Sequence, residues 1–315
     1  MVPARVAARA ARATARPRWA ARRRDQGVPR RAGALLGAAR GACDRTCGPR
    51  GAVRPGRRRA VSDAVGGARG GPRRHRPGDA HSYALGEWAA LEALRHRPGA
   101  VRAVLLDPAL DGSRRARLTL AAERAGVPWR DDARALRALR HRSDARALVL
   151  LDASPDALDA TADHVALIGT RNAGNLGAVL RASLGFDLRD VALIGSRLDP
   201  WSPHVLRASL GARFALRVAT FADAQAYGEA HPQRTVATFG AARPGRPSVA
   251  LPEAHLPRPV TLAFGPEWPD ASSGEHPAGA ADGLTVHIPQ HPDLESHNLA
   301  VAVGIVLYAL RHGAC

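Results

Sequence analysis

The feature that most constrains this chain is a turn rich in glycine and asparagine between a predicted strand and a predicted helix. The run 164–169 is short, apolar and ends on glycine, which is typical of a buried strand. Residues 172–181 have the sequence Asn-Ala-Gly-Asn-Leu-Gly-Ala-Val-Leu-Arg, and the predicted helix opens at Leu176, with Arg181 about one turn inside it. Helix starts attract anions and arginine binds pairs of oxygen atoms, so a phosphate or a ribose oxygen is the expected guest. Turns of this composition are also common as purely structural connections, so this turn by itself leaves both interpretations open.

Two further polar turns follow predicted strands later in the chain. Residues 260–267 have the sequence Val-Thr-Leu-Ala-Phe-Gly-Pro-Glu, and residues 286–290 have the sequence Val-His-Ile-Pro-Gln and continue to Ser296-His297-Asn298 before an apolar helix. In order and spacing, the three turns resemble the three motifs of the SpoU (TrmH-like) family of RNA ribose 2′-O-methyltransferases, in the SPOUT superfamily. The resemblance covers about residues 163–313 and includes the runs Asp199–His204 and Arg207–Ala212.

The resemblance implies a particular α/β fold for residues 163–315. In this fold a mostly parallel sheet is flanked by helices and carries a C-terminal trefoil knot. The residues alone predict the same layers, because strand and helix patterns alternate along the segment. The expected strands are His164–Ile168, Val191–Ile194, Phe214–Val218, Thr235–Phe239, Val260–Phe264 and Leu284–Ile288.

The resemblance also implies roles for individual residues. The residues implied to line a pocket for the cofactor S-adenosylmethionine are Gly265, Ile288 and His297. The residues implied to form the catalytic site are Arg181, Asn175, Glu267, Ser296 and Asn298. An arginine stays protonated and is a poor base, so we expect Arg181 to position the phosphate beside the ribose hydroxyl. Asn175 would orient the substrate or the motif loop, and Glu267 would brace the loops. Ser296 and Asn298 also suit a plain helix N-cap.

The chain departs from the family pattern at three places. His297 stands where leucine is usual, Gln290 replaces a frequent methionine, and Trp268-Pro269 follows Glu267 where a glycine is common. We expect these changes to affect cofactor affinity more than the fold. The leading hypothesis is an RNA ribose methyltransferase acting on rRNA or tRNA. The alternatives are a knotted RNA-binding or assembly factor with weakened methyl transfer, and a base methyltransferase from elsewhere in the superfamily.

Positive charge is concentrated at the start of the chain. Residues 1–80 hold 21 arginines and four aspartates, a net +17 out of the formal total of +18. The segment is rich in Ala, Arg, Gly and Pro and poor in large apolar residues, so we expect a disordered basic tail. Three interpretations stay open: an arm that binds RNA backbone, an organelle transit peptide, and a stretch that precedes the true start of the protein.

Residues 81–155 show alternating helix and strand patterns, which predict a small α/β domain. The expected helices are Gly86–Leu94, Arg114–Ala125 and Ala133–His141, and the expected strands are Val101–Asp107, Val127–Trp129 and Ala147–Leu151. The opening Tyr83-Ala84-Leu85-Gly86 resembles the small RNA substrate-binding domain that precedes the catalytic domain in many SpoU enzymes. A plain packing domain fits the pattern nearly as well. An Asp-rich linker is expected at 152–163.

Cysteine content and hydropathy restrict the class of protein. The chain has three cysteines, Cys43, Cys47 and Cys315. A small and odd number of cysteines argues against a disulfide framework and suits a reducing cytosol. No metal site is expected. Every apolar run is shorter than the roughly 18 residues of a membrane helix, so we expect a cytoplasmic protein. The helix opening at Leu299 is apolar nearly all round, which favours packing against a partner subunit, and the resemblance implies a homodimer.

Overall fold

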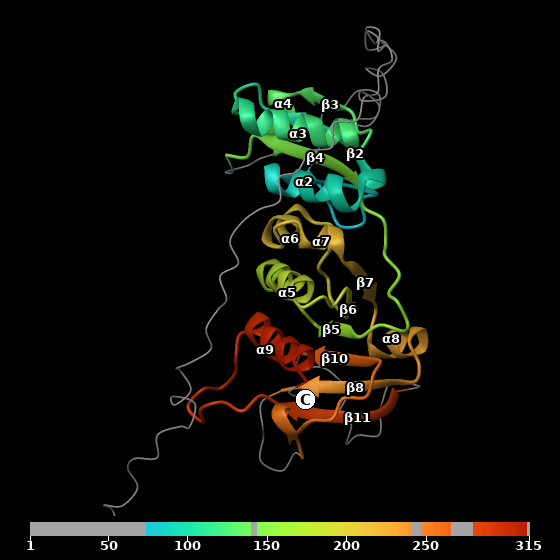
Figure 1. The fold of residues 1–315 in the computed structure, drawn as a ribbon. Helices are drawn as coiled ribbons and strands as arrows, with labels where there is room; N and C mark the ends of the chain where they lie inside the picture. The colour runs from blue at the N-terminus through green and yellow to red at the C-terminus, as the bar shows by residue number, and fades with distance from the viewer. Residues whose placement is uncertain (1–73, 140–143, 241–246, 266–279, 314–315) are drawn as a thin grey trace, which may run out of the picture. The chain divides into compact units, whose positions relative to one another are not determined.

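The computed structural model describes residues 74–139, 144–240, 247–265 and 280–313, and of residues 280–282 only the backbone (Figure 1). The described residues all belong to one compact unit, 54–315. Of the predicted basic tail, only residues 74–80 are described. Glu267, Trp268-Pro269 and the three cysteines also lie outside the described residues. Within the described ranges, each helix is too short or too polar to cross a membrane.

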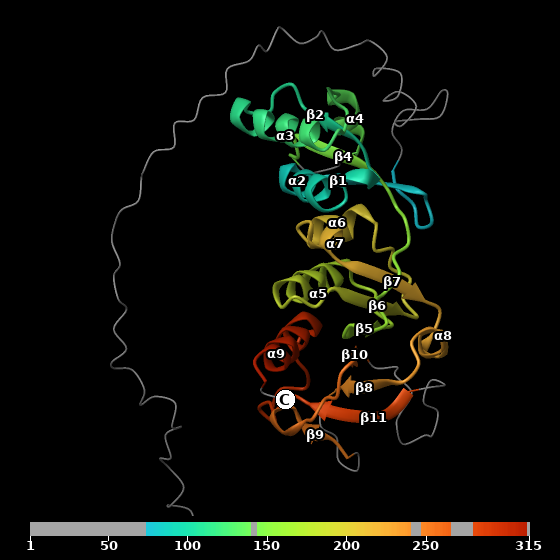
Figure 2. The same cartoon turned by 45° about the vertical axis from the view of Figure 1, so that its right-hand side comes forward.

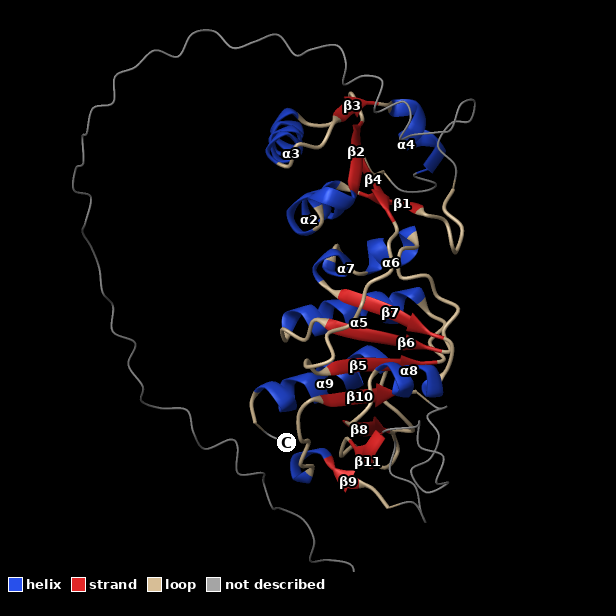
Figure 3. Ribbon diagram, turned by 90° about the vertical axis from the view of Figure 1, so that its right-hand side faces the viewer, coloured by secondary structure: helices blue, strands red, loops and turns tan. Residues whose placement is uncertain are grey.

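A four-stranded mixed sheet forms from residues 81–152, which we call the small-sheet region. Its strands are β1 (His81–Leu85), β2 (Val101–Leu106), β3 (Trp129–Asp131) and β4 (Ala147–Asp152), in the order β1-β4-β2-β3. Its helices are α2 (Glu87–His96), α3 (Gly112–Arg124) and α4 (Ala133–Leu139), with a short 3₁₀ turn at Pro98–Ala100. Figure 3 shows α2 and α3 on one face of this sheet and α4 on the other, and separate apolar clusters fill the two faces.

A seven-stranded sheet forms from the rest of the described chain, in the order β7-β6-β5-β10-β8-β11-β9. Its strands are β5 (His164–Ile168), β6 (Asp190–Ile194), β7 (Arg217–Phe221), β8 (Arg234–Phe239), β9 (Val249–Ala250), β10 (Val260–Phe264) and β11 (Ala280–His287). Every neighbouring pair is parallel. Its helices are α5 (Ala173–Gly185), α6 (Pro203–Ala208), α7 (Ala212–Ala215), α8 (Ala224–Ala230) and α9 (Leu299–Arg311), with a 3₁₀ turn at Leu251–Glu253.

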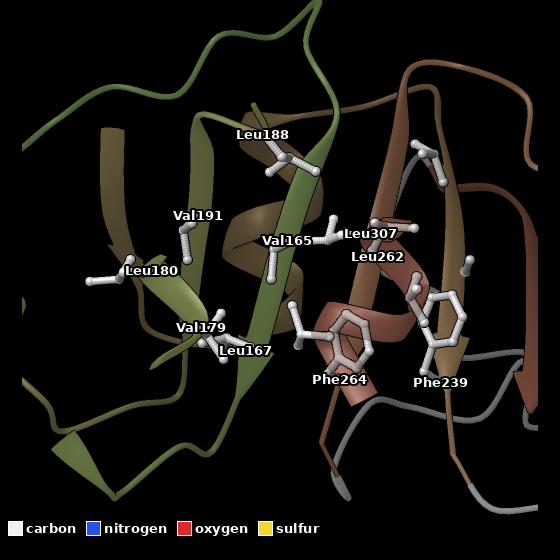
Figure 4. Packing of buried hydrophobic residues seen from close by; sticks show 14 of the residues in the cluster. Val165, Leu167, Val179, Leu180, Leu188, Val191, Phe239, Leu262, Phe264 and Leu307 are labelled. Carbon is white, nitrogen blue, oxygen red and sulfur yellow. The ribbon is translucent and has the colours of Figure 1, made fainter. Parts of the chain in front are cut away.

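Alternation along the central strands divides the core of this sheet between its two faces. Val165 and Leu167 of β5 pack in the cluster that also holds the buried residues of α5 and α9, whereas Ala166 and Ile168 join Tyr227 of α8 in a second cluster. Figure 2 shows α5 and α9 on one face and α8 on the other. In the first cluster the rings of Phe239 and Phe264 stack with their centroids 4.8 Å apart (Figure 4).

The small-sheet region contacts the segment 199–216 through Arg97, which donates to the carbonyl oxygens of Phe214 and Leu216 and shares Asp156 with the buried Arg213. Arg213 is fully buried, its guanidinium lies 3.8 Å from the centroid of the Trp201 ring, and its Nη1 lies 2.9 Å from Asp156 Oδ2. Arg97 of the loop after α2 donates to the other oxygen of Asp156 at 2.7 Å. Burial lowers the pKa of Arg213 to about 10, and Asp156 acts against that effect. Asp156 thus joins two cations from distant parts of the chain.

Several predicted elements were placed wrongly at their ends. The strand expected at Val127–Trp129 is Trp129–Asp131, and the strand expected at Leu284–Ile288 is Ala280–His287. The strand expected at Phe214–Val218 begins only at Arg217, because Phe214 lies in the short helix α7 that follows the left-handed Gly211 (φ 85°). The helix expected to open at Leu176 begins at Ala173. The predicted strands His164–Ile168 and Val260–Phe264 are confirmed at both ends.

Candidate functional site

The predicted site residues that the structure describes follow the strands at the carboxyl edge of the large sheet. Strand β5 lies between β6, which follows it in the chain, and β10, which comes much later. The strand order therefore reverses beside β5. In open α/β sheets, ligands bind outside the carboxyl ends of the strands at such a reversal. The topology places the turns after β5 and after β10 side by side.

Asn172 fixes the turn after β5. It is the N-cap of α5, and its side-chain oxygen accepts hydrogen bonds from the N–H groups of Gly174 (2.8 Å) and Asn175 (3.1 Å). Two N–H groups that the sequence seemed to leave for a ligand are therefore already bonded. Arg181 lies about 12 Å along the helix axis from Ala173, at 1.5 Å per residue. The N–H groups of Gly174 and Asn175 are therefore not free to bind an anion, and Arg181 stays a predicted site residue.

Gly177 is required by packing between α5 and α6. A Cβ atom at this position would lie 2.4 Å from Ala208 Cβ and 2.6 Å from its carbonyl carbon, closer than real Cβ atoms approach. The glycine thus lets α6 lie directly on α5. No packing role was predicted for Gly177 from the sequence. Gly177 and Ala208 are both small and both lie in runs that carry the family resemblance, so the sequence offered a signal for close packing of the two helices.

Asn298 connects the turn before α9 to the turn after β5. Its Oδ1 accepts from Ala300 N–H at 2.9 Å, which makes it the N-cap of α9, and its Nδ2 donates to Asn175 Oδ1 at 3.3 Å. The helix cap and the polar contact, weighed as alternatives from sequence, are made by the same side chain. Ser296 lies exposed two residues earlier.

Gly265 brings β10 close to β5. Its φ is +137°, and an added Cβ would lie 2.6 Å from the Ile168 carbonyl oxygen. Only glycine fits this backbone without displacement. Ile288, just after β11, is half-buried against the main core cluster, and His297 is half-buried before α9. Glu267 lies outside the described residues, so its place in the site stays a prediction.

Arg181 lies exposed on α5. It makes no hydrogen bond or ion pair with the described residues, so its N–H donors face solvent and can bind an anionic ligand. The described part of the chain contains no group of three His, Cys, Asp or Glu side chains that could hold a metal ion. The site therefore offers amides, one exposed guanidinium and close-packed backbone at a sheet edge.

Comparisons of sequence identify relatives of the large-sheet segment. Residues 163–308 match the family model of the SpoU rRNA Methylase family. An uncharacterized tRNA/rRNA methyltransferase of Synechocystis sp. is 33% identical over 144 residues, which make up 44% of this chain and 48% of that protein. The mitochondrial rRNA methyltransferase 3 of Xenopus laevis is 43% identical over 53 residues, 17% of this chain and 13% of that protein. The chain thus spans about half, or less, of the length of the curated relatives it matches.

Solved structures share the fold over more of the chain. The crystal structure of an RNA 2′-O ribose methyltransferase is 24% identical, with a TM-score of 0.58 over 83% of this chain and 97% of that chain. The AdoMet-bound rRNA methyltransferase from Sinorhizobium meliloti is 22% identical, with a TM-score of 0.57 over 74% and 88%. These similarities confirm the α/β fold with a mostly parallel sheet flanked by helices.

Proposed function

We propose that this chain, whose residues 163–308 match the SpoU rRNA Methylase family model, is an RNA methyltransferase that uses S-adenosylmethionine. The acceptor would be a ribose 2′-hydroxyl of rRNA or tRNA. The observation that carries the proposal is the hydrogen bond from Asn298 to Asn175, because it joins two of the three motifs at the sheet edge where such folds bind ligands.

The residues at this edge fit the cofactor. Gly265 ends β10 where a Cβ would clash with Ile168, so strand packing requires the glycine, and any contact of Gly265 with the cofactor would be made by its main chain. The half-buried side chain of Ile288 provides an apolar surface of the kind that suits an adenine ring, and His297 would contribute mainly through its backbone. When bound, S-adenosylmethionine supplies a methyl group that is already activated on a sulfonium sulfur.

The chain's own residues must position the acceptor and ease the loss of its proton. Arg181 would bind the phosphate beside the target ribose and hold the hydroxyl in line, because its guanidinium stays protonated. Asn175 would orient the acceptor strand, with its own amide fixed by Asn298. Ser296 would add a polar contact, and Glu267 would brace the loops. The ribose hydroxyl would lose its proton to solvent as its oxygen takes the methyl group that the bound cofactor supplies.

We further propose a homodimer and a knotted C-terminal segment. Val301 and Tyr308 of α9 are 51% and 57% exposed and lie seven residues apart, so they share one face of the helix. Two exposed apolar side chains on one helix face suit a partner subunit. The knot is supported by sheet order, because β10 returns between β5 and β8 before the chain reaches β11 and α9.

The experiment that tests the function combines cofactor binding with methyl transfer. Isothermal titration of S-adenosylmethionine should give a Kd in the micromolar range for the full chain and for Arg181→Ala. Transfer of labelled methyl groups to rRNA and tRNA pools should fall about 10²- to 10³-fold in Arg181→Ala, the effect of removing one positioned donor. Arg189→Ala, which removes an arginine ion-paired on the surface with Asp187, is the matched control and should retain activity.

Each other outcome points to a different function. A folded chain that does not bind S-adenosylmethionine would overturn the proposal. A chain that binds the cofactor and RNA but methylates neither pool would favour the RNA-binding or assembly factor. Methyl groups recovered on bases instead of ribose would favour the base methyltransferase.

A further inference from the structure

A surface hollow on the small-sheet region combines an exposed aromatic ring with two exposed arginines. Its lining residues come from the first turn of α2 and the first two turns of α3, and they are Glu87, Trp88, Ser113, Arg114 and Arg117. We propose that this hollow binds one nucleotide of single-stranded RNA, with the base stacked on Trp88 and the phosphate held by Arg114 and Arg117. The inference rests on the proposed function in that the RNA would be the methylation substrate.

Trp88 does not contribute to the core. Helix α2 buries Ala89, Ala90, Ala93 and Leu94, whereas Trp88 is 61% exposed. Among the described residues, no aromatic ring or guanidinium stacks on its indole. A large apolar ring left in water at the rim of a hollow is a surface on which a base can stack, and such stacking tolerates any base.

Glu87 positions the two arginines without occupying them. Its Oε1 lies 3.3 Å from Arg114 Nη1, and its Oε2 lies 3.9 Å from Arg117 Nη2. The side chains of the two arginines are 61% and 63% exposed, whereas that of Glu87 is 20% exposed. A guanidinium has five N–H donors, so each arginine keeps donors for a phosphate after pairing with the carboxylate.

The surrounding charge suits a polyanion. Residues 74–153 contain fifteen arginines against ten acidic residues. Arg124 follows Arg117 by seven positions, so exposed arginines continue along the same face of α3 for about 10 Å beyond the hollow. An aromatic ring beside arginines matches a base and its phosphate, and an extended backbone can continue toward Arg124. This chemistry favours RNA over a protein partner.

The test is fluorescence anisotropy of the full chain with a labelled oligoadenosine of about twelve nucleotides. Trp88→Ala should weaken binding about 5- to 150-fold, the effect of losing one base stack, and Trp88→Phe should restore most of it. Arg114→Ala with Arg117→Ala should weaken binding and reduce the slope of log K against log salt by about 0.7, the effect of one lost phosphate contact. Trp88→Ala should leave that slope unchanged.

The matched controls are Trp129→Ala, a second exposed tryptophan of the same region, and Arg95→Ala in the last turn of α2. The site would be overturned if Trp88→Ala weakened RNA binding no more than Trp129→Ala does. It would also be overturned if the hollow bound a protein partner and its substitution left RNA affinity unchanged. Oligonucleotide binding needs no methyl transfer. A chain that methylates RNA but binds it independently of Trp88 therefore contradicts only this inference, and the converse result contradicts only the proposed function.

Discussion

Asn298 donates from its Nδ2 to Asn175 Oδ1 at 3.3 Å, while its own Oδ1 caps α9. One side chain thus makes both the helix cap and the contact with Asn175, and different substitutions can remove these two interactions separately. Asn298→Asp keeps the acceptor for Ala300 N–H but loses the donor to Asn175, so stability should stay near that of the wild type while methyl transfer falls. Asn298→Ala loses both and should also lower the free energy of unfolding by about 1 kcal/mol. Urea unfolding and methyl transfer, measured on both variants, check this. Equal activity in Asn298→Asp and the wild type would contradict a role for the contact.

Gly265→Ala should be strongly destabilising. The new Cβ would lie 2.6 Å from the Ile168 carbonyl oxygen, at a φ of +137° that side chains rarely adopt. Together these effects cost about 2 to 4 kcal/mol or displace the loop, which would also weaken binding of S-adenosylmethionine. Gly240→Ala is the control, because Gly240 also follows a strand but has nothing within 4 Å of a Cβ. Chemical unfolding measures the stability of each variant, and titration measures its affinity for S-adenosylmethionine. Equal losses of stability and affinity in Gly265→Ala and Gly240→Ala would refute the role of the close contact with Ile168.

Val301→Glu should convert the proposed dimer to a monomer. The side chain is half exposed on the face of α9 that also carries Tyr308, so a charge there disrupts an apolar interface but not the core. Light scattering after size exclusion measures the mass. Leu120→Glu, at a comparably exposed position on α3, should leave the mass unchanged. A wild type that is monomeric at every concentration would rule out the dimer itself.

Asp156→Asn should destabilise the chain far more than an ordinary surface change. Burial alone would raise the pKa of Asp156, but the charges of Arg213 and Arg97 outweigh it and hold the pKa below its usual value. Neutralising Asp156 leaves Arg213 buried without its counter-charge, which costs about 3 to 5 kcal/mol. Asp187→Asn, in an exposed pair with Arg189, should cost less than about 1 kcal/mol. Thermal and urea unfolding of both variants compare the two costs.

Acid should weaken the chain through His164. Burial, with a smaller effect of Arg234, lowers its pKa from 6.5 to about 4. His164 Nε2 donates to the Asp159 carbonyl at 2.8 Å, so Nδ1 accepts from the Tyr227 hydroxyl, also at 2.8 Å. Protonation would place a second hydrogen in that contact.

Between about pH 6.5 and pH 4 the unfolded chain binds a proton that the folded chain does not, so the free energy of unfolding falls as the pH is lowered. The loss from this group reaches about 3 kcal/mol at the acid end. Urea unfolding at a series of pH values measures it. His164→Gln should be less stable near neutrality yet show a shallower dependence on pH, and an unchanged dependence would assign the effect to other groups.

The sequence predicts elements best where burial on both faces leaves a continuous apolar run. Strands β5 and β10 are of this kind, and their ends were predicted to the residue. Phe214 misled the pattern because its apolar neighbours alternate as in a strand, while Gly211 turns the backbone into a helix there. The role of Arg213 was not predictable, since a charged residue is rarely buried and its partner Asp156 is far away in the chain.

The site was predictable in its members more than in its geometry. Family resemblance pointed to Asn175, Asn298 and Gly265, and the structure brings the first two into contact and packs the third against β5. The start of α5 was misplaced because an asparagine suits a helix N-cap as well as a ligand-binding site, and in the structure Asn172 is the N-cap. The exposure of Trp88 was not predicted, because an aromatic residue in an amphipathic helix is usually part of the core.

The position of β10 in the large sheet has a consequence for synthesis on the ribosome. Strands β5, β6 and β7 emerge first and can pair with one another, but the other edge of β5 stays unpaired until Val260–Phe264 has been made. A nascent chain held at that stage exposes the unpaired edge of a five-residue apolar strand, with which other chains could pair. Folding of the large sheet must therefore wait until β10 has been made, which leaves that edge of β5 open to other chains during synthesis.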